Sequence, residues 1–379
     1  MSNDYSGRIP REGTVRRVLL VFGTRPEAIK MCPLVQALRQ RRDRFETAVC
    51  VTGQHREMLE QVLGVFGVQP DYDLHVMRPG QSLADITREV IGGIDRLVER
   101  ERPDLVLVHG DTTTSFAAAL ACFYRRIPVG HVEAGLRTGD LDRPWPEEFN
   151  RRTVDLVSRY RFAPTQRARQ NLLDEQCAPE SVFVTGNTGI DALRTTVLPD
   201  YHSDYLEWSR DSRLVLLTAH RREALGMPMH SMFRAIRQVV ADRPDVKVLY
   251  PVHPNPAVQE AARAELYGCD RIKIVDPMSV LDFHNVLARC YLVLTDSGGI
   301  QEEAPSLGKP VLVMRDATER PEGVEAGTLK LIGTTGNSVA RGFSRLLDDP
   351  DAYAEMSRAS NPYGDGHACE RIIEVLERA

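Results

Sequence analysis

Short, nearly unbroken apolar segments recur along the chain, and each is followed by a polar loop and a segment with helical spacing. Such runs are typical of strands covered on both faces, because polar residues have no place where neither face meets water. Strands that alternate with helices predict βαβ units, and therefore parallel sheets. Strands of this kind are expected at 17–22, 48–51, 105–108, 128–132, around 162, and at 182–184, 214–218, 247–250, 272–275, 292–295 and 310–314.

This alternation pauses once, near the middle of the chain. It stops at 186–189, and we interpret 198–210, which is polar, aromatic and irregular, as a linker region. A chain of 379 residues is also longer than one usual domain. The sequence therefore predicts an α/β fold with two doubly wound, Rossmann-like domains. Ligands would bind in an interdomain cleft, beyond the carboxyl ends of the strands.

The domain boundaries are placed where the composition changes. Residues 1–13 are polar and lack the apolar core of a secretory signal, so we predict a disordered tail. The N-terminal domain is expected at 14–188 and the C-terminal domain at 189–361. The last segment, 362–379, is expected to end in a helix.

Composition and spacing exclude several classes of function. A formal net charge of −5 argues against a nucleic-acid surface, and no apolar run approaches the roughly 20 residues of a membrane span. The seven cysteines are scattered, without a C-x-x-C pair, and are interpreted as reduced thiols of a cytoplasmic protein. Metal-ligand spacing and the G-x-G-x-x-G pattern are both missing, so we predict no metal and no cofactor.

The segment Ser297-Gly298-Gly299 lies between an apolar strand and a short acidic helix. Glycines at such a turn let a ligand approach the backbone closely. The free N–H groups of the helix N-terminus, together with the helix dipole, then attract an anion. We therefore predict a phosphate site suited to a nucleotide diphosphate. A catalytic Ser297 is disfavoured, because the G-x-S-x-G elbow is missing.

Charged side chains follow several other strands. Arg25 and Lys30 would place two cations near a diphosphate or a sugar oxygen, although a solvent-exposed arginine in a turn is the alternative. Asp111, Glu133 and Glu147 would together supply acids and bases whose pKa values one site could separate. Taken singly, Asp111 could cap a helix and Glu147 could complement a helix dipole.

Two histidines follow strands in the second half of the chain. His220 ends an apolar strand beside two arginines, and we favour a functional role for it. His253 lies between prolines and is more consistent with ordering a loop than with a catalytic base.

Eight separated motifs stand in order along the chain. They are GTRPEAIK at 23–30, TGQH at 52–55, HGDT at 109–112, HVEAGLRT at 131–138, PWPEE at 144–148, HRRE at 220–223, TDSGGIQEE at 295–303 and ERPE at 319–322. Together they resemble the non-hydrolysing UDP-N-acetylglucosamine 2-epimerases, over roughly residues 15–379. This resemblance implies the GT-B fold, with the helix in 362–379 returning to the N-terminal domain. It also implies a cytoplasmic homodimer that serves polysaccharide biosynthesis, without nucleic-acid or membrane partners.

The resemblance further implies reversible epimerisation of UDP-GlcNAc to UDP-ManNAc at C2. UDP would be eliminated to leave bound 2-acetamidoglucal, and would add back after protonation on the opposite face, without a redox cofactor. Acid and base roles are implied for Asp111, Glu133, Glu147 and His220, and which carboxylate removes the C2 proton stays open. Substrate or UDP contacts are assigned to Arg25, Lys30, His253, Phe283, Ser297, Gly298, Gly299, Glu303 and Arg320.

The sequence also departs from the family pattern. Met278 stands where a glutamine is frequent near the uracil, and Ala224 replaces a frequent asparagine. Glu57 and Gly80 depart from the residues associated with activation by a second UDP-GlcNAc. A 2-epimerase of a modified UDP-N-acetylhexosamine, such as a UDP-2,3-diacetamido uronic acid, is therefore compatible with the sequence. A GT-B glycosyltransferase and a non-catalytic nucleotide-sugar sensor are also compatible with a nucleotide site in the C-terminal domain.

Overall fold

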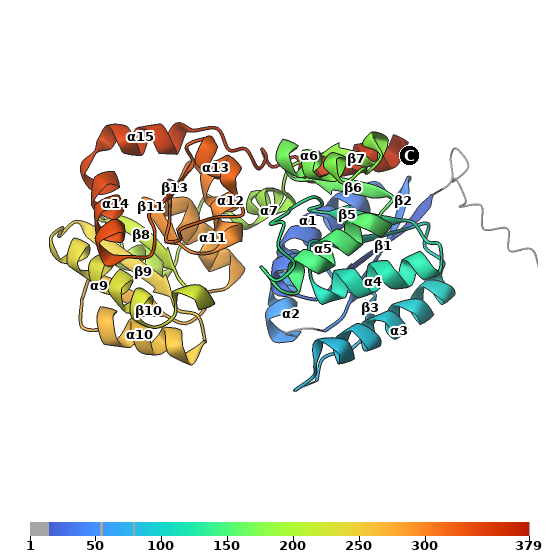
Figure 1. Ribbon diagram of the computed structural model, residues 1–379, viewed down its shortest axis with the longest axis horizontal. Helices are drawn as coiled ribbons and strands as arrows, with labels where there is room; N and C mark the ends of the chain where they lie inside the picture. The colour runs from blue at the N-terminus through green and yellow to red at the C-terminus, as the bar shows by residue number, and fades with distance from the viewer. Residues whose placement is uncertain (1–14, 54–55, 79, 379) are drawn as a thin grey trace, which may run out of the picture. The chain divides into compact units, whose positions relative to one another are not determined.

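A computed structural model describes residues 15–53, 56–78 and 80–378 (Figure 1). The predicted tail at 1–13 and two residues of one motif, Gln54 and His55, lie outside the described residues. The chain divides into two compact units. Unit 1 runs up to Thr195 and takes up the chain again from Gly364, and unit 2 comprises Thr196–Tyr363.

Unit 1 is built on a parallel seven-stranded sheet in the order β3-β2-β1-β4-β5-β6-β7. Its strand order reverses between β1 and β4, which makes this pair the switch point where α/β proteins place ligands. The strands are Arg16–Phe22 (β1), Phe45–Val51 (β2), Tyr72–Asp73 (β3), Leu105–His109 (β4), Val129–Val132 (β5), Tyr160–Ala163 (β6) and Val182–Val184 (β7).

Two series of helices cover this sheet. α3, α4 and α5 pack side by side, and so do α2, α1 and α16. Helix starts follow the sequence closely, because Thr24, Ser82 and Thr112 each cap the first turn of α1, α3 or α4 with a side-chain oxygen. The helices are Arg25–Gln40 (α1), Arg56–Val65 (α2), Leu83–Glu101 (α3), Thr113–Tyr124 (α4), Glu147–Val157 (α5), Gln166–Asp174 (α6), Thr188–Thr196 (α7) and Ala368–Arg378 (α16).

Unit 2 repeats the plan with a parallel six-stranded sheet in the order β10-β9-β8-β11-β12-β13. Here the order reverses between β8 and β11. The strands are Arg213–Thr218 (β8), Val246–Pro251 (β9), Ile272–Val275 (β10), Leu292–Thr295 (β11), Val311–Val313 (β12) and Leu329–Leu331 (β13). The helices are Asp204–Trp208 (α8), Met227–Ala241 (α9), Pro256–Leu266 (α10), Val280–Arg289 (α11), Gly298–Ser306 (α12), Pro321–Glu325 (α13), Gly336–Asp348 (α14) and Pro350–Arg358 (α15).

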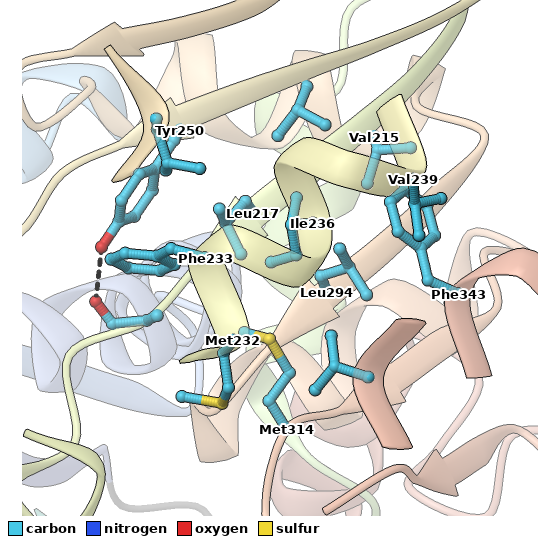
Figure 2. Packing of buried hydrophobic residues seen from close by; sticks show 14 of the residues in the cluster. Val215, Leu217, Met232, Phe233, Ile236, Val239, Tyr250, Leu294, Met314 and Phe343 are labelled. Atoms are coloured by element: carbon cyan, nitrogen blue, oxygen red, sulfur yellow. Dashed lines mark hydrogen bonds between the residues drawn. The ribbon is translucent and has the colours of Figure 1, made fainter. Parts of the chain in front are cut away.

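The core of unit 2 reaches the first residues of a loop at the sheet edge (Figure 2). Phe233 of α9 packs edge-on against Tyr250 of β9, with ring centroids 5.5 Å apart. The buried hydroxyl of Tyr250 donates a 2.8 Å hydrogen bond to the carbonyl of Ala219, directly after β8. Since a buried hydroxyl without a partner costs free energy, this bond both completes the core and holds the backbone before His220.

The two parallel sheets confirm the predicted α/β class with two doubly wound halves. The linker predicted at 198–210 is partly wrong, because it contains α8, which Ser203 caps. The division into units follows Thr195, whereas the sequence placed a boundary after 188. α7 remains with unit 1 because Asp191 accepts hydrogen bonds from the backbone N–H groups of Ala368 and Cys369. Among the described residues, no helix has the length and hydropathy that crossing a membrane requires.

Candidate active site

The predicted site residues form two groups, each at the carboxyl edge of the sheet in its own unit. In unit 1 they follow β1, β4 and β5 or begin α5, and in unit 2 they follow β8, β9 and β11 or lie on the next helices. The unit 1 group comprises Arg25, Lys30, Asp111, Glu133 and Glu147. The unit 2 group comprises His220, His253, Phe283, Ser297, Gly298, Gly299, Glu303 and Arg320.

Glu133 is the centre of the unit 1 group. Its carboxylate pairs with the ammonium of Lys30, and their side chains are only 10% and 11% exposed. Nε2 of His109 lies 3.6 Å from the same carboxylate oxygen, and the amide of Asn187 donates to it over 3.5 Å. Burial alone would raise the pKa of Glu133, but the charge of Lys30 and the contact with His109 hold that pKa well below its usual range. Glu133 is therefore a buried anion.

The backbone of Glu133 has a left-handed conformation, with φ of 69°. A residue with a side chain adopts this region at a cost of about 1–3 kcal/mol, and such positions concentrate at functional sites. Lys30 reaches Glu133 from α1, whose first turn is fixed by a capping box of Thr24 and Glu27. The buried carboxylate of Glu27 also accepts hydrogen bonds from Thr112 and Ser115, so it ties the start of α1 to that of α4. Arg25 is the first residue of α1 and is partly buried.

Asp111 contacts α5, the helix that begins with Glu147. The guanidinium of Arg151 pairs with the Asp111 carboxylate, and Asn150 donates a 2.9 Å hydrogen bond to its backbone carbonyl. Glu147 lies one turn before Arg151, on the same face of α5. Oε2 of Glu147 is buried without a hydrogen-bond partner among the described residues. Asp111 is thus paired with a cation, while one oxygen of Glu147 is left for another ligand.

His220 and Asp296 join the two strands at the switch point of unit 2. The buried carboxylate of Asp296 accepts hydrogen bonds of 2.6 and 2.8 Å from the backbone N–H groups of His220 and Arg221. Its second oxygen lies 3.1 Å from Nδ1 of His220, a charge contact without ideal hydrogen-bond geometry. Burial alone would raise the pKa of Asp296, but His220 and the two backbone N–H groups outweigh burial and lower that pKa. An ionised Asp296 favours the tautomer of His220 that carries its proton on Nδ1, and Nε2 of His220 then points away from Asp296.

His253 stacks on His220, with ring centroids 5.3 Å apart and planes inclined by 13°. Its Nδ1 accepts a 3.1 Å hydrogen bond from the N–H of Asn255, within its own loop. Burial and the neighbouring His220 lower the pKa of His253. A neutral His253 ring therefore supports one face of His220.

Ser297 caps α12, and Gly298 and Gly299 are the first two residues of this nine-residue helix. The predicted separate turn is therefore wrong in detail, because the glycines are helical. A Cβ atom on Gly298 would lie 2.9 Å from Cζ of Arg320, so a glycine is needed where the guanidinium packs on the helix start. Glu302 accepts a 2.5 Å hydrogen bond from Nε of Arg320 and holds it there. A helix N-terminus and a guanidinium at one place form an anion site.

Glu303 and Phe283 lie beside a buried histidine that the sequence analysis did not assign. Nε2 of His284 is 3.7 Å from Glu303, and its Nδ1 shares a 2.7 Å hydrogen bond with the hydroxyl of Thr196. Phe283 precedes His284 on α11, and their rings are in edge contact. His284 therefore lies within ion-pair distance of the Glu303 carboxylate.

Sequence reasoning missed several residues that contact the predicted ones, among them His109, Asn150, Arg151, Asn187, His284, Asp296 and Glu302. His109, His284, Asp296 and Glu302 lie inside the motifs or next to an assigned residue, so adjacency could have found them. Asn150 and Arg151 approach Asp111, and Asn187 approaches Glu133, only through tertiary contacts. The described part of the chain has no group of three or more His, Cys, Asp or Glu side chains suited to a metal ion.

Comparison with known proteins gives one consistent family. A family model described as UDP-N-acetylglucosamine 2-epimerase matches residues 36–377. A Bacillus subtilis UDP-N-acetylglucosamine 2-epimerase is 55% identical over 360 residues, which are 95% of this chain and 94% of the relative. A putative UDP-N-acetylglucosamine 2-epimerase structure from Listeria monocytogenes has a TM-score of 0.90 and 52% identity, and covers 96% of each chain. A Neisseria meningitidis UDP-GlcNAc 2-epimerase structure, described as bound to UDP-GlcNAc, has a TM-score of 0.89 and 45% identity, and covers 96% of this chain and all of that one.

Proposed function

The chain belongs to the UDP-N-acetylglucosamine 2-epimerase family, and we propose that the two groups of side chains described above interconvert UDP-GlcNAc and UDP-ManNAc. The observation that carries this assignment of roles is the buried Glu133 anion beside Lys30. A buried carboxylate that is ionised can accept a proton from C2, but Lys30 makes it a weak base, so loss of this proton must be coupled to the departure of UDP.

Inversion at C2 requires a proton acceptor on one face of the sugar and a donor on the other. We assign one face to Glu133, and the other to Asp111, which contacts Asn150 and Arg151 of α5, and to Glu147, the first residue of that helix. The unpartnered oxygen of Glu147 is available for a substrate hydroxyl or a transferred proton. Loss of the C2 proton is coupled to cleavage of the C1–O bond, because the carbanion alone would be too unstable. Bound 2-acetamidoglucal and UDP then recombine after protonation from the opposite face.

The departing diphosphate needs positive charge that is already in place. The α12 N-terminus, with Ser297, Gly298 and Gly299, and the guanidinium of Arg320 supply it. Glu303 is assigned to the ribose and Phe283 to the uracil. His220, aligned by Asp296 and supported by His253, is assigned to the diphosphate oxygen that gains or loses charge. Arg25 is assigned to the substrate beside Lys30.

We further propose a homodimer. Large apolar side chains are exposed on neighbouring helices of unit 1: Tyr124 of α4 is 68% exposed and Leu156 of α5 is 78% exposed. Phe149, also on α5, is exposed as well. Exposed apolar side chains gathered on adjacent elements mark contact surfaces. A second copy that presents the same helices would cover them symmetrically.

A cytoplasmic enzyme of polysaccharide biosynthesis is the setting we propose. All seven cysteines lie within the described residues and are free thiols, which fits a reducing compartment. Deleting the gene and measuring N-acetylmannosamine in the cell-surface polysaccharides tests this setting. An unchanged content would contradict it.

Incubation with UDP-GlcNAc in D₂O tests the reaction. We expect deuterium at C2 and the appearance of UDP-ManNAc in proton NMR spectra, with no acceptor added. Turnover that requires an acceptor would instead indicate a glycosyltransferase. Exchange only with a UDP-2,3-diacetamido uronic acid would indicate the modified substrate. Binding without exchange would contradict the acid and base roles.

A further inference from the structure

His131 and Asp155 form a fully buried pair in unit 1 that the reaction described above does not use. His131, in β5, has no exposed side-chain surface, and the Asp155 side chain, in α5, is 1% exposed. Nδ1 of His131 lies 2.6 Å from Oδ1 of Asp155, and its Nε2 lies 2.8 Å from the carbonyl oxygen of Gly110. Both ring nitrogens therefore face oxygens.

The hydrogen-bond partners of this pair fix the position of one proton, on Nε2 of His131. The carbonyl of Gly110 can only accept, so Nε2 of His131 carries a proton. Asp155 also accepts from the N–H of Gly135 over 3.2 Å, and it contacts the guanidinium of Arg137 at 2.8 Å. Burial alone would raise the pKa of Asp155, but His131 and Arg137 outweigh it and lower that pKa. Nε2 of His131 thus donates to Gly110, while its Nδ1 shares a hydrogen bond with Asp155, which also accepts from Gly135 and pairs with Arg137.

These bonds join the three segments that carry the proposed acid and base residues. Gly110 immediately precedes Asp111, and His131 and Gly135 flank Glu133 two residues away on either side. Asp155 lies two turns after Glu147 on α5. One buried pair therefore connects the loop after β4, the loop after β5 and α5.

One residue of the connected backbone is held in a conformation that needs such support. Glu133 has a left-handed φ of 69°, whereas Gly110 and Gly135, at 61° and 85°, are glycines and adopt this region without strain. Strained positions persist only where the surroundings fix them. A Cβ atom on Gly135 would lie 2.2 Å from the carbonyl oxygen of Ala168, so this loop has no room to move toward α6.

We propose that the His131–Asp155 pair positions the three carboxylates, and that its hydrogen bonds rather than its charges do so. This proposal rests on the proposed function of those carboxylates. Asp155 and His131 are positioning residues, because they act on the substrate only through Asp111, Glu133 and Glu147. A displacement of about 1 Å at a reacting group can cost about 10²-fold in rate.

Three variants of α5 separate positioning from stability. Asp155→Ala removes every bond that Asp155 makes, and we expect kcat to fall about 100-fold. In Asp155→Asn, the amide nitrogen can donate to an unprotonated Nδ1 of His131, and the amide oxygen can still accept from Gly135 and Arg137. Nε2 of His131 keeps its bond to the carbonyl of Gly110. We expect it to retain at least about a tenth of kcat, which would rescue most of the loss. Val154→Ala, at the adjacent fully buried position, is the matched control.

The assay measures kcat and KM for UDP-GlcNAc, the affinity for UDP and the Tm of each variant. We expect KM and UDP affinity to stay within about threefold of wild type for all three variants, because UDP is assigned to unit 2. Val154→Ala should lower Tm, as Asp155→Ala does, but keep kcat within about threefold of wild type. Equal kcat for Asp155→Ala and Val154→Ala would overturn the proposal. Equal losses for Asp155→Asn and Asp155→Ala would also overturn it, because the charge would then be what matters.

Two further measurements keep the test decisive. If Asp155→Ala does not fold, His131→Asn replaces it, since its amide can still donate to Asp155 but leaves the Gly110 carbonyl without its donor. A kcat at least about tenfold lower supports positioning, and a wild-type kcat overturns it. Wild-type C2 exchange in D₂O tests the proposed function separately, so failure of the reaction is distinguishable from failure of the positioning role.

Discussion

Replacing Gly298 by alanine tests the anion site through one contact. A Cβ atom there would lie 2.9 Å from both Cζ and Nη1 of Arg320. Carbon atoms pack at about 3.5–4.0 Å, so the guanidinium would have to retreat by roughly 0.6–1.1 Å. It cannot do so freely, because Nε of Arg320 is held by Glu302 at 2.5 Å and the Arg320 carbonyl by the hydroxyl of Tyr363 at 3.0 Å.

The expected loss follows from the bond that the guanidinium would make. A hydrogen bond to a charged group contributes about 1.5–3 kcal/mol. Losing one such bond to the diphosphate would weaken UDP binding roughly 10- to 100-fold. Tm should fall slightly, because the retreat strains the bond between Arg320 and the buried carboxylate of Glu302, and the higher helix propensity of alanine offsets only part of this loss.

Isothermal titration calorimetry with UDP measures this effect. Gly299→Ala is a close comparison, because its Cβ atom would meet only Glu303, at 3.8 Å, and should cost less affinity. Gly64→Ala in α2, with no atom within 4 Å of the new Cβ, is the control for a glycine replaced within a helix. Wild-type affinity in Gly298→Ala would refute the claim that Arg320 and the α12 N-terminus bind the diphosphate together.

Three more changes have defined outcomes. Glu133→Gln should lower epimerisation about 10²- to 10⁴-fold while UDP still binds, measured by NMR and calorimetry, and unchanged turnover would contradict its role. Burial alone would raise the pKa of Glu319, but the neighbouring Arg315 outweighs burial and lowers that pKa from 4.5 to about 2. The stability that Glu319 contributes is therefore lost as the pH falls through that window. Glu319→Gln should flatten the fall in the free energy of unfolding there, by about 3 kcal/mol at most, measured by denaturation at each pH, and an unchanged pH dependence would contradict this role. Leu156→Asp should give monomers in sedimentation experiments, whereas the control Met227→Asp, at an exposed site of unit 2, should not. A dimer that persists in Leu156→Asp would rule out the α4–α5 surface.

The sequence predicted elements best where their ends depend on neighbouring residues. β10 at Ile272–Val275 and β11 at Leu292–Thr295 begin and end where expected, and α16 lies in the segment that was expected to end in a helix. Ser82 caps α3, and Pro103 follows its end, so both signals are local. β3 and β13, with two and three residues, were missed because such short strands carry no periodicity.

In the predicted linker at 198–210, neighbouring residues do not predict the structure. Its sequence is irregular, yet α8 forms within it and packs against α11. Trp208 and Tyr205 of α8 also contact a buried apolar cluster of unit 2. Packing against residues distant in the sequence stabilises this helix, which the local sequence does not predict.

The sequence by itself determined the class of fold, the family and the loops that carry the chemistry, because apolar periodicity, caps and motif spacing are properties of neighbouring residues. Only the tertiary structure decided which side chains meet. Lys30 lies 103 residues from the Glu133 that it pairs with, and Asp296 lies 76 residues from His220. Gly298 is required by the guanidinium of Arg320 rather than by a turn. Charge pairing, burial and steric fit depend on distances in space, and the folded sheets set those distances.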